Sequence, residues 1–370
     1  MQVTIYPGAL SGSVTPPPSK SQSHRLVLAA ALAAGESRIT KLGRSRDITA
    51  TLDCVRALGA EVRLAGDTAE ISGIREGPEE LPQMDCGESG STLRFLIPVA
   101  LAAAGGGVFY GRGRLMQRPQ EPYFAIFREK GIAFSQNGDT LTVRGSLTPG
   151  IYRLPGNVSS QFITGLLYAL PLLDGDSEIL LTTELESAPY VDMTLDALER
   201  AGVRVVSGAK GWHVPGNQRF RPLRMQVEGD WSQAAFFAAA RFPGDGIRLL
   251  GLDPASRQGD RCLLDMETRL RQPGRAVLDV SGKREGEVWV GIRPEGFIPD
   301  GNGPFTCQMD RVEVMGRDVS VVSTHPQMTG TCVRSIVSSE NRFDPQQKDV
   351  RFRLKPYKVF LFDRESEERI

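Results

Sequence analysis

The 370-residue chain carries 44 Lys and Arg residues against 44 Asp and Glu residues, and 40% of its residues are hydrophobic. This zero balance excludes the general basic field that attracts nucleic acid or an anionic membrane surface, and the length allows two or three domains with well-formed cores. The five cysteines are scattered without a C-x-x-C pair, so we expect reduced thiols, no zinc site and a cytoplasmic location. No apolar run is long enough to cross a bilayer, and we expect neither a targeting segment nor a membrane span.

The first predicted element is a helix that begins within PPPSKSQSHR. Lys20, Arg25 and three serines crowd its start, and the body that follows is almost wholly apolar, which is typical of a buried helix. A strand is expected over 36–41, an amphipathic helix over 46–58, and then two short alternating strands. Gly59 stands where the second helix should end.

The same succession of elements returns about every 71 residues. Its strands are expected over 107–110 and 177–182, its amphipathic helices over 121–130 and 190–201, and its hairpins over 129–145 and 200–216. Three complete α-β-α-β-β units then fill residues 20–216, and a fourth begins at 230 without being completed. The pattern predicts an α/β (α+β) fold with buried helices.

Four helix starts in this pattern are rich in hydroxyl groups. They read SKSQSH, ESGST, SSQFIT and DWSQ. A helix start offers unpaired N–H groups and a partial positive charge, so several starts on one face would form an anion site. Taken singly, each serine is better explained as an ordinary cap, and Lys20, Arg25 and Arg118 as solvated charges. Together they favour a phosphorylated small molecule as ligand.

Seven motifs resemble the EPSP synthase family, the 3-phosphoshikimate 1-carboxyvinyltransferases. They are PPSKSxxxR, GESGSTLRFL, LMQRPQ, NVSSQFITGLL, SAPYVDMTL, VEGDWSQAAFF and GLDPASRQGD, which occur in the family's order between residue 1 and about 267. The sister enolpyruvyl transferases that act on UDP-N-acetylglucosamine share the repeat fold, but their start and their reactive-cysteine loop look different. The resemblance implies two domains of three repeats each, which close over 3-phosphoshikimate and phosphoenolpyruvate without a cofactor.

The resemblance also implies which residues bind the substrates. Those for 3-phosphoshikimate would be Lys20, Ser21, Arg25, Ser159, Ser160, Gln161, Ser187 and Tyr190. Those for phosphoenolpyruvate would be Lys20, Gly90, Arg118 and Gln161. The sequence Glu88-Ser89-Gly90 departs from the family's usual Asn-Ala-Gly, and an acid beside an anionic substrate is unfavourable unless it points away. No residue is assigned as the catalytic acid or base.

The family's later motifs are not recognisable after residue 267. They comprise an Asp that handles the 5-hydroxyl proton, a Lys-Glu-Ser-Asp-Arg stretch, and an Arg and a Lys that clamp phosphoenolpyruvate. GKREG at 282–286 has the wrong order and reads as a hairpin tip, and Glu340 is no better a match. We therefore expect enolpyruvyl transfer to be impaired because the second catalytic domain is missing.

Residues 276–370 consist instead of short alternating runs between Gly, Pro and Asp, which predicts a small OB-like β-barrel. VGIRPEGF and residues 351–370 resemble the C-terminal TOBE domain of sugar-importer ABC transporter ATPases, which implies a contact with a transporter. No G-x-x-x-x-G-K-[ST] motif accompanies this segment. Its aromatic residues are expected in the barrel core rather than on a nucleic-acid surface: Trp289, Phe297, Phe305, Phe352, Tyr357, Phe360 and Phe362.

The sequence thus predicts an EPSP synthase-like domain over 1–250, a junction over 251–275 and a barrel over 276–370. The segment from about 255 to 275 should lack partners and remain mobile, because the fourth unit stops inside its second helix. Three hypotheses stay open. The chain is an enzyme of chorismate and aromatic amino-acid biosynthesis, a non-catalytic chimera that binds 3-phosphoshikimate, or a transporter-associated orphan fusion.

Overall fold

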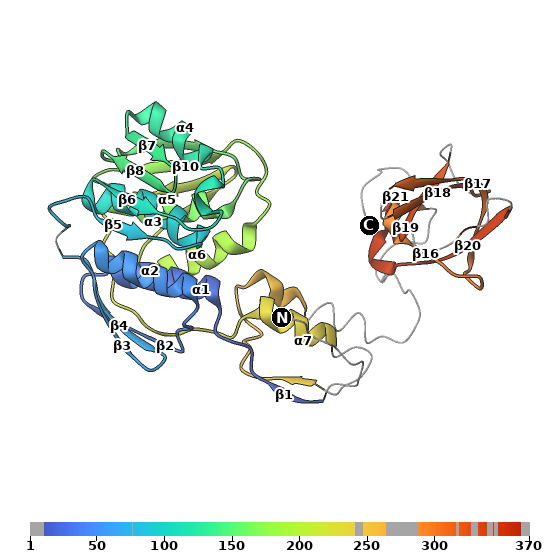
Figure 1. The fold of residues 1–370 in the computed structure, drawn as a ribbon, viewed down its shortest axis with the longest axis horizontal. Coiled ribbons are helices and arrows are strands. Elements are labelled where there is room, and N and C mark those ends of the chain that lie inside the picture. The colour runs from blue at the N-terminus through green and yellow to red at the C-terminus, as the bar shows by residue number, and fades with distance from the viewer. Residues whose placement is uncertain are drawn as a thin grey trace. The chain divides into compact units, whose positions relative to one another are not determined.

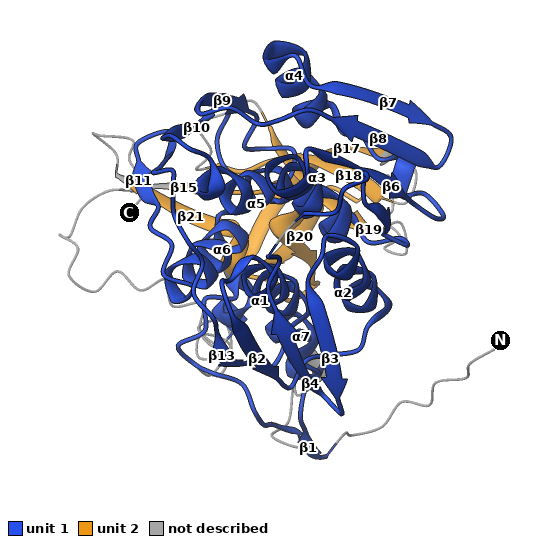
Figure 2. Cartoon of the chain, turned by 90° about the vertical axis from the view of Figure 1, so that its left-hand side faces the viewer, with its two compact units in different colours: residues 1–271 blue, residues 272–370 orange. Residues whose placement is uncertain are grey.

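The computed structural model describes residues 11–75, 77–240, 247–263, 288–315, 318–326, 332–338, 343 and 347–363. The chain divides into two compact units, residues 1–271 and 272–370 (Figure 2).

Three four-stranded sheets of the first unit have the same internal order. Figure 1 draws and labels most strands of two of them. In each, one edge strand runs parallel to the next strand, which pairs antiparallel with the second strand of a hairpin. The sheets are β13 (Arg224–Gln226), β2 (Glu36–Thr40), β4 (Thr68–Ser72) and β3 (Glu61–Ala65); β5 (Gln83–Asp85), β6 (Gly106–Tyr110), β8 (Thr140–Arg144) and β7 (Ala133–Asn137); and β9 (Gly150–Leu154), β10 (Ser177–Leu181), β12 (Gly211–Val214) and β11 (Val206–Gly208).

Six helices of the first unit pack with these sheets around one hydrophobic core. Helices α1 (Lys20–Leu32), α3 (Gly90–Ala104) and α5 (Ser160–Ala169) are buried over most of their length, as expected for helices that are apolar almost all round. Helices α2 (Arg46–Ala57), α4 (Glu121–Lys130) and α6 (Ala188–Arg200) bury one face only. Serine side chains cap the starts of α1, α2, α3 and α5, at Ser19, Ser45, Ser89 and Ser159.

Helices α3 and α5 approach each other closely because a glycine faces a proline. Pro98 has no N–H, so the carbonyl of Arg94 lacks its helical partner, and the Tyr123 hydroxyl lies 2.7 Å from that oxygen and donates to it. A Cβ atom on Gly165 would overlap the Tyr123 hydroxyl and would lie 2.5 Å from the Arg94 carbonyl oxygen and 2.8 Å from Pro98 Cγ. Only glycine therefore fits at this crossing.

Gly165→Ala is expected to lower the free energy of unfolding by roughly 1–3 kcal/mol, because a methyl group here meets backbone and a buried hydroxyl. Gly43→Ala is the matched control, since its Cβ would meet no atom closer than 3.7 Å. Urea unfolding followed by circular dichroism measures both. Equal midpoints for the two variants would contradict the packing described.

The Glu228 carboxylate holds residues 256 and 258, near the end of the described part of the first unit. Ser256 Oγ and Gln258 Nε2 donate to Glu228 Oε2 at 2.5 and 3.2 Å, and the Trp231 N–H donates to Gln258 Oε1 at 3.1 Å. The expectation that residues from 255 onward lack partners is wrong for Ser256 and Gln258, which donate to Glu228. It is also wrong for Asp260, which accepts from Ser232, and for Arg261, which donates to the Pro254 carbonyl at 2.8 Å. Residues 264–275 of that segment lie outside the described residues.

Helix α7 (Trp231–Ala240) contacts the short helix η3 (Gly259–Cys262) and strand β14 (Ile247–Leu249), which pairs in parallel with β1 (Gly12–Val14). None of the helices within the described ranges is long and apolar enough to cross a membrane.

The second unit holds antiparallel strands only, within its described residues. A five-stranded sheet has the order β16 (Phe297–Pro299), β20 (Asp349–Leu354), β17 (Phe305–Met315), β18 (Asp318–Thr324) and β19 (Val333–Ser338), and β15 (Val288–Ile292) pairs with β21 (Val359–Asp363). Phe297 and Phe352 lie in the core, whereas Tyr357 is 65% exposed, so its assignment to the core is wrong. It follows a Pro in a short turn of helix rather than a strand. GKREG at 282–286 and Glu340 lie outside the described residues.

Candidate anion-binding site

Arg25 of α1 ties together the helix starts expected to bind a phosphate. Its Nε donates to Thr194 Oγ1 at 2.9 Å, and its two terminal nitrogens donate to the Ser21 carbonyl at 2.8 Å and the Tyr190 carbonyl at 2.7 Å. Arg25 is only 3% exposed. Burial lowers the pKa of its guanidinium to about 10, so the group remains a cation at neutral pH.

A second set of contacts adds α5 to this arrangement. Thr164 Oγ1 of α5 lies 2.9 Å from Thr194 Oγ1, and the Tyr168 hydroxyl donates to the Arg25 carbonyl at 2.9 Å. Helices α1, α5 and α6 are therefore fixed to one another around a buried cation. An arginine has five N–H donors, and the three contacts with Thr194, Ser21 and Tyr190 leave two for a ligand.

The predicted serines have different environments. Ser159 caps α5 by accepting from the Gln161 N–H at 3.3 Å, Ser160 is 6% exposed, and Ser21 is half-buried. Ser187 precedes α6, but its side chain makes no capping hydrogen bond there. Ser159 is thus an ordinary cap whose hydroxyl proton remains free to donate, whereas the Ser187 hydroxyl is not committed to its helix.

Gly90, Arg118 and Gln161 form a second group at the start of α3. A Cβ atom on Gly90 would lie 3.0 Å from an Arg118 terminal nitrogen and 3.5 Å from Gln161 Oε1. Gln161 Nε2 donates to Ser91 Oγ at 3.0 Å, and its Oε1 accepts from Arg94 at 2.9 Å. The structure therefore brings together three of the four residues predicted for phosphoenolpyruvate.

Lys20, the fourth, is engaged with acidic residues that sequence reasoning did not single out. Its ammonium pairs with Asp47 Oδ2 at 2.9 Å, and its backbone N–H donates to Asp230 Oδ2 at 3.1 Å. Asp230 Oδ1 also accepts from the Gln233 N–H at 3.0 Å, so one carboxylate caps α1 and α7 together. The motif VEGD contained the signal for Asp230.

A buried hydroxyl network connects α1, α2 and α3 beneath these residues. His24 Nδ1 lies 2.8 Å from Thr51 Oγ1, which lies 2.7 Å from Thr92 Oγ1, and Thr92 donates to the capping Ser89 at 2.7 Å. Burial lowers the pKa of His24 to about 3, so its ring is neutral at physiological pH. The network fixes the starts of the three helices without adding a charge.

Glu88 is directed toward Gly113. A Cβ atom on Gly113 would lie 2.8 Å from Glu88 Oε1, and the glycine has φ +58°. Glu88 lines an open pocket of about 680 Å³ with Arg44, Arg46 and Arg112, a pocket that Gly90, Arg118 and Gln161 do not line.

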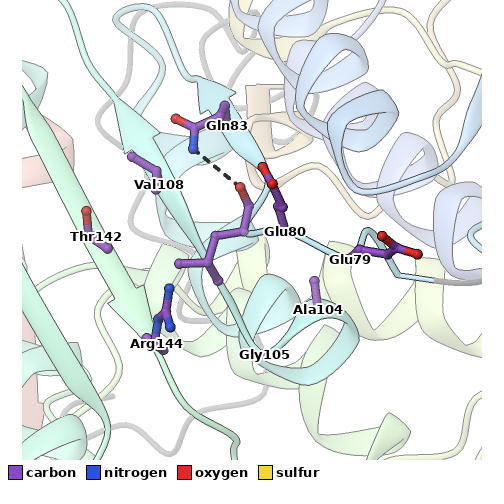
Figure 3. Close-up of a pocket in the computed structure, with 9 residues that line it drawn as sticks. Glu79, Glu80, Gln83, Ala104, Gly105, Val108, Thr142 and Arg144 are labelled. Atoms are coloured by element: carbon purple, nitrogen blue, oxygen red, sulfur yellow. Dashed lines mark hydrogen bonds between the residues drawn. The ribbon is translucent and has the colours of Figure 1, made fainter.

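Another pocket of about 630 Å³ lies where α3 ends, beside Gly105 (Figure 3). Glu79, Glu80 and Arg144 line it, and Gln83 donates to the Leu81 carbonyl at 3.3 Å. It contains none of the predicted substrate residues, so the helix starts are the better candidate site.

Within the described residues, no cluster of three His, Cys, Asp or Glu side chains could hold a metal ion.

Comparison with known proteins identifies relatives over most of the chain. The family EPSP synthase (3-phosphoshikimate 1-carboxyvinyltransferase) matches residues 5–295. A 3-phosphoshikimate 1-carboxyvinyltransferase of Clostridium beijerinckii is 44% identical over 277 residues, 72% of this chain and 63% of the relative. One from Clostridioides difficile is 42% identical over 295 residues, 76% of this chain and 67% of the relative.

Comparison with solved structures shows that the fold is similar to that of EPSP synthases. EPSP synthase structures from Acinetobacter baumannii superpose with TM-scores of 0.57 and 0.59, at 25% and 24% identity. They cover 66% and 70% of this chain, and 56% and 60% of the solved chains. The family match continues to residue 295, so the expected end of the resemblance near 267 is wrong. The chain spans about 63% of the length of the first relative named.

Proposed function

Because the chain belongs to the EPSP synthase family, the 3-phosphoshikimate 1-carboxyvinyltransferases, we propose that its first unit binds 3-phosphoshikimate at the starts of α1, α5 and α6. The observation that carries this proposal is the buried Arg25, whose guanidinium joins α1 to α6 beside α5. A phosphate would receive charge-assisted hydrogen bonds from Arg25 and Lys20, each worth about 1.5–3 kcal/mol. Ser21, Ser159, Ser160, Gln161, Ser187 and Tyr190 complete the proposed pocket.

Phosphoenolpyruvate is proposed to bind at the Gly90, Arg118 and Gln161 group, with Lys20 reaching it from α1. The missing side chain at Gly90 leaves room for an anion against the Arg118 guanidinium. Glu88 is compatible with this assignment because its carboxylate lies over Gly113.

The proposed reaction transfers the enolpyruvyl group to the 5-hydroxyl of 3-phosphoshikimate, in chorismate and aromatic amino-acid biosynthesis. The hydroxyl oxygen gives up its proton and bonds to C2 of phosphoenolpyruvate, while C3 gains a proton. The resulting tetrahedral intermediate then loses phosphate, and C3 returns a proton as the double bond re-forms. We propose that this chain performs the reaction poorly, because no acid or base for these proton transfers is recognisable after residue 267.

Two further proposals concern the remainder of the chain. The division into 1–250, a junction over 251–275 and an OB-like barrel over 276–370 is supported by the antiparallel sheet of the second unit. Two alternative functions are also proposed. In the first, the chain is a cytoplasmic chimera that binds 3-phosphoshikimate without turnover. In the second, it is an orphan fusion whose TOBE-like tail contacts a transporter. Genomic sequence across the junction would distinguish a natural fusion from an assembly join.

Isothermal titration of 3-phosphoshikimate into the purified 370-residue chain tests the proposed function. Weak saturable binding with one site per chain is expected. The absence of heat at millimolar ligand would overturn the proposal. Shikimate, which lacks the phosphate, is the matched control ligand and should bind at least about tenfold more weakly.

A further inference from the structure

We propose that Arg94 of α3 is a positioning residue for the phosphoenolpyruvate subsite, because its guanidinium holds both Gln161 and the loop that carries Arg118. This inference rests on the proposed function and adds a residue that none of the sequence motifs assigned.

All three nitrogens of the Arg94 guanidinium donate to elements of the subsite. Nε donates to Gln120 Oε1 at 3.4 Å, one terminal nitrogen to Gln161 Oε1 at 2.9 Å, and the other to the Pro119 carbonyl at 3.2 Å. Gln120 is 3% exposed, and its Nε2 donates to the Arg118 carbonyl at 3.2 Å. Arg94 therefore holds the loop backbone at Pro119 directly and at Arg118 through the Gln120 amide.

The contact with Gln161 also sets the orientation of its amide. Gln161 Oε1 accepts from Arg94 while its Nε2 donates to Ser91 Oγ at 3.0 Å. Arginine can only donate, so exchanging the two ends of the amide would place two donors against each other and lose the bond to Arg94. Gly90 lies between Gln161 and Arg118. A displacement of either side chain would close or widen the space that Gly90 leaves open.

Arg94 is itself held rigidly. Its guanidinium carbon lies 4.5 Å from the centre of the Phe162 ring, and its own carbonyl accepts from the Tyr123 hydroxyl. Burial is the main cause that lowers the pKa of Arg94, and nearby Arg118 lowers it further, which places two cations in the same site. Among the residues that the structure describes, neither arginine has an ion-pair partner, so both charges remain available to an anion.

The competing explanation is that Arg94 only joins α3 to α5 as part of the core. Two variants separate the alternatives. Arg94→Met keeps the aliphatic stem over Phe162, and Arg94→Lys keeps the charge but cannot reach three acceptors in one plane. Arg128→Met is the matched control, since Arg128 of α4 is an exposed arginine lying 5.9 Å from the centre of the Phe134 ring and paired with Glu121.

Two measurements are made on the full chain. Hydrogen–deuterium exchange without ligand reports on the loop, and titration of phosphoenolpyruvate in saturating 3-phosphoshikimate reports on the subsite. Both Arg94 variants should exchange several-fold faster over residues 115–120 than wild type, while Arg128→Met should not. Phosphoenolpyruvate should bind about tenfold more weakly to both, with 3-phosphoshikimate affinity changed less than about twofold.

The outcomes distinguish this inference from the proposed function. Wild-type exchange over residues 115–120 in Arg94→Met would overturn the positioning role, whether or not any ligand binds. Wild-type phosphoenolpyruvate affinity in Arg94→Lys would also overturn it, because charge alone would then suffice. If wild-type protein binds no 3-phosphoshikimate, the proposed function fails while the exchange result still decides the role of Arg94.

Gln120→Met is the second variant if Arg94→Met does not fold, because it removes one of the three contacts of Arg94. It should show the same effects in weaker form. Wild-type exchange and wild-type phosphoenolpyruvate affinity in Gln120→Met would contradict the inference.

Discussion

Arg25→Ala is expected to remove measurable binding of 3-phosphoshikimate, a loss of about 100-fold or more in affinity. Arg25 is the buried cation at the meeting point of α1 and α6, and a phosphate there would lose its charge-assisted donors. The change also leaves the Thr194 hydroxyl and the Ser21 and Tyr190 carbonyls without their donor, so stability should fall. Calorimetry gives the affinity, and thermal unfolding confirms that the variant is folded at the assay temperature.

Ser21→Ala is the matched variant for Arg25→Ala. Arg25 uses the Ser21 carbonyl rather than its hydroxyl, so this substitution keeps the contact between α1 and Arg25. Loss of one neutral hydrogen bond should weaken binding by about tenfold at most. If Arg25→Ala binds 3-phosphoshikimate as tightly as wild type, residues 20 to 25 are merely a capped helix start.

Purified wild-type chain given 3-phosphoshikimate and phosphoenolpyruvate should release phosphate at a rate close to background. A positioned acid or base contributes about 10² to 10⁴-fold, and the absence of two such groups would reduce the rate by about 10⁴-fold or more. A site closed by two complete domains also orients the substrates and excludes water, and an incomplete second wall loses part of that effect. A coupled phosphate assay over several hours measures the residual rate.

Lys20→Ala serves as the contamination control for this assay. Its ammonium is paired with Asp47 on the exposed side of α1, so the substitution leaves the core intact. Any phosphate release that persists unchanged in Lys20→Ala comes from another enzyme in the preparation. Robust release that depends on Lys20 would contradict the prediction, and would show that the second unit or a second chain supplies the missing groups.

Helix ends and hairpins are the part of this fold that the sequence predicts well. Helix α4 ends at Lys130, and Gly131 follows with φ +68°, a conformation that favours glycine. The alternating residues of β7 and β8 follow at once. These elements depend on local preferences, so a single sequence contains the necessary signal.

The edge strands were missed because their pairing is not local. β5 and β13 have three residues each, too few for an alternating pattern, and β13 pairs with β2 from 186 residues away, as in Arg224 opposite Arg38. Such strands exist because a partner strand offers free backbone groups.

The sequence motifs predicted residues of the candidate site, but they did not indicate which residues form hydrogen bonds or ion pairs with them. Thr194 holds Arg25 across 169 positions, and Arg94 holds Gln161 across 67. Neither relation has a sequence signature, because Thr194 and Arg94 occur in helices where they read as ordinary helical residues. Asp47 was overlooked for the same reason, although it pairs with Lys20.

The most direct test of the central claim is where 3-phosphoshikimate protects the chain from hydrogen–deuterium exchange. Saturating ligand should slow exchange at the starts of α1, α5 and α6, over residues 19–26, 157–162 and 186–191. The pocket beside Gly105, lined by Glu79 and Arg144, should exchange at the same rate with and without ligand. Protection confined to that pocket, or to the second unit, would contradict the account, as would binding without protection of any of the three helix starts.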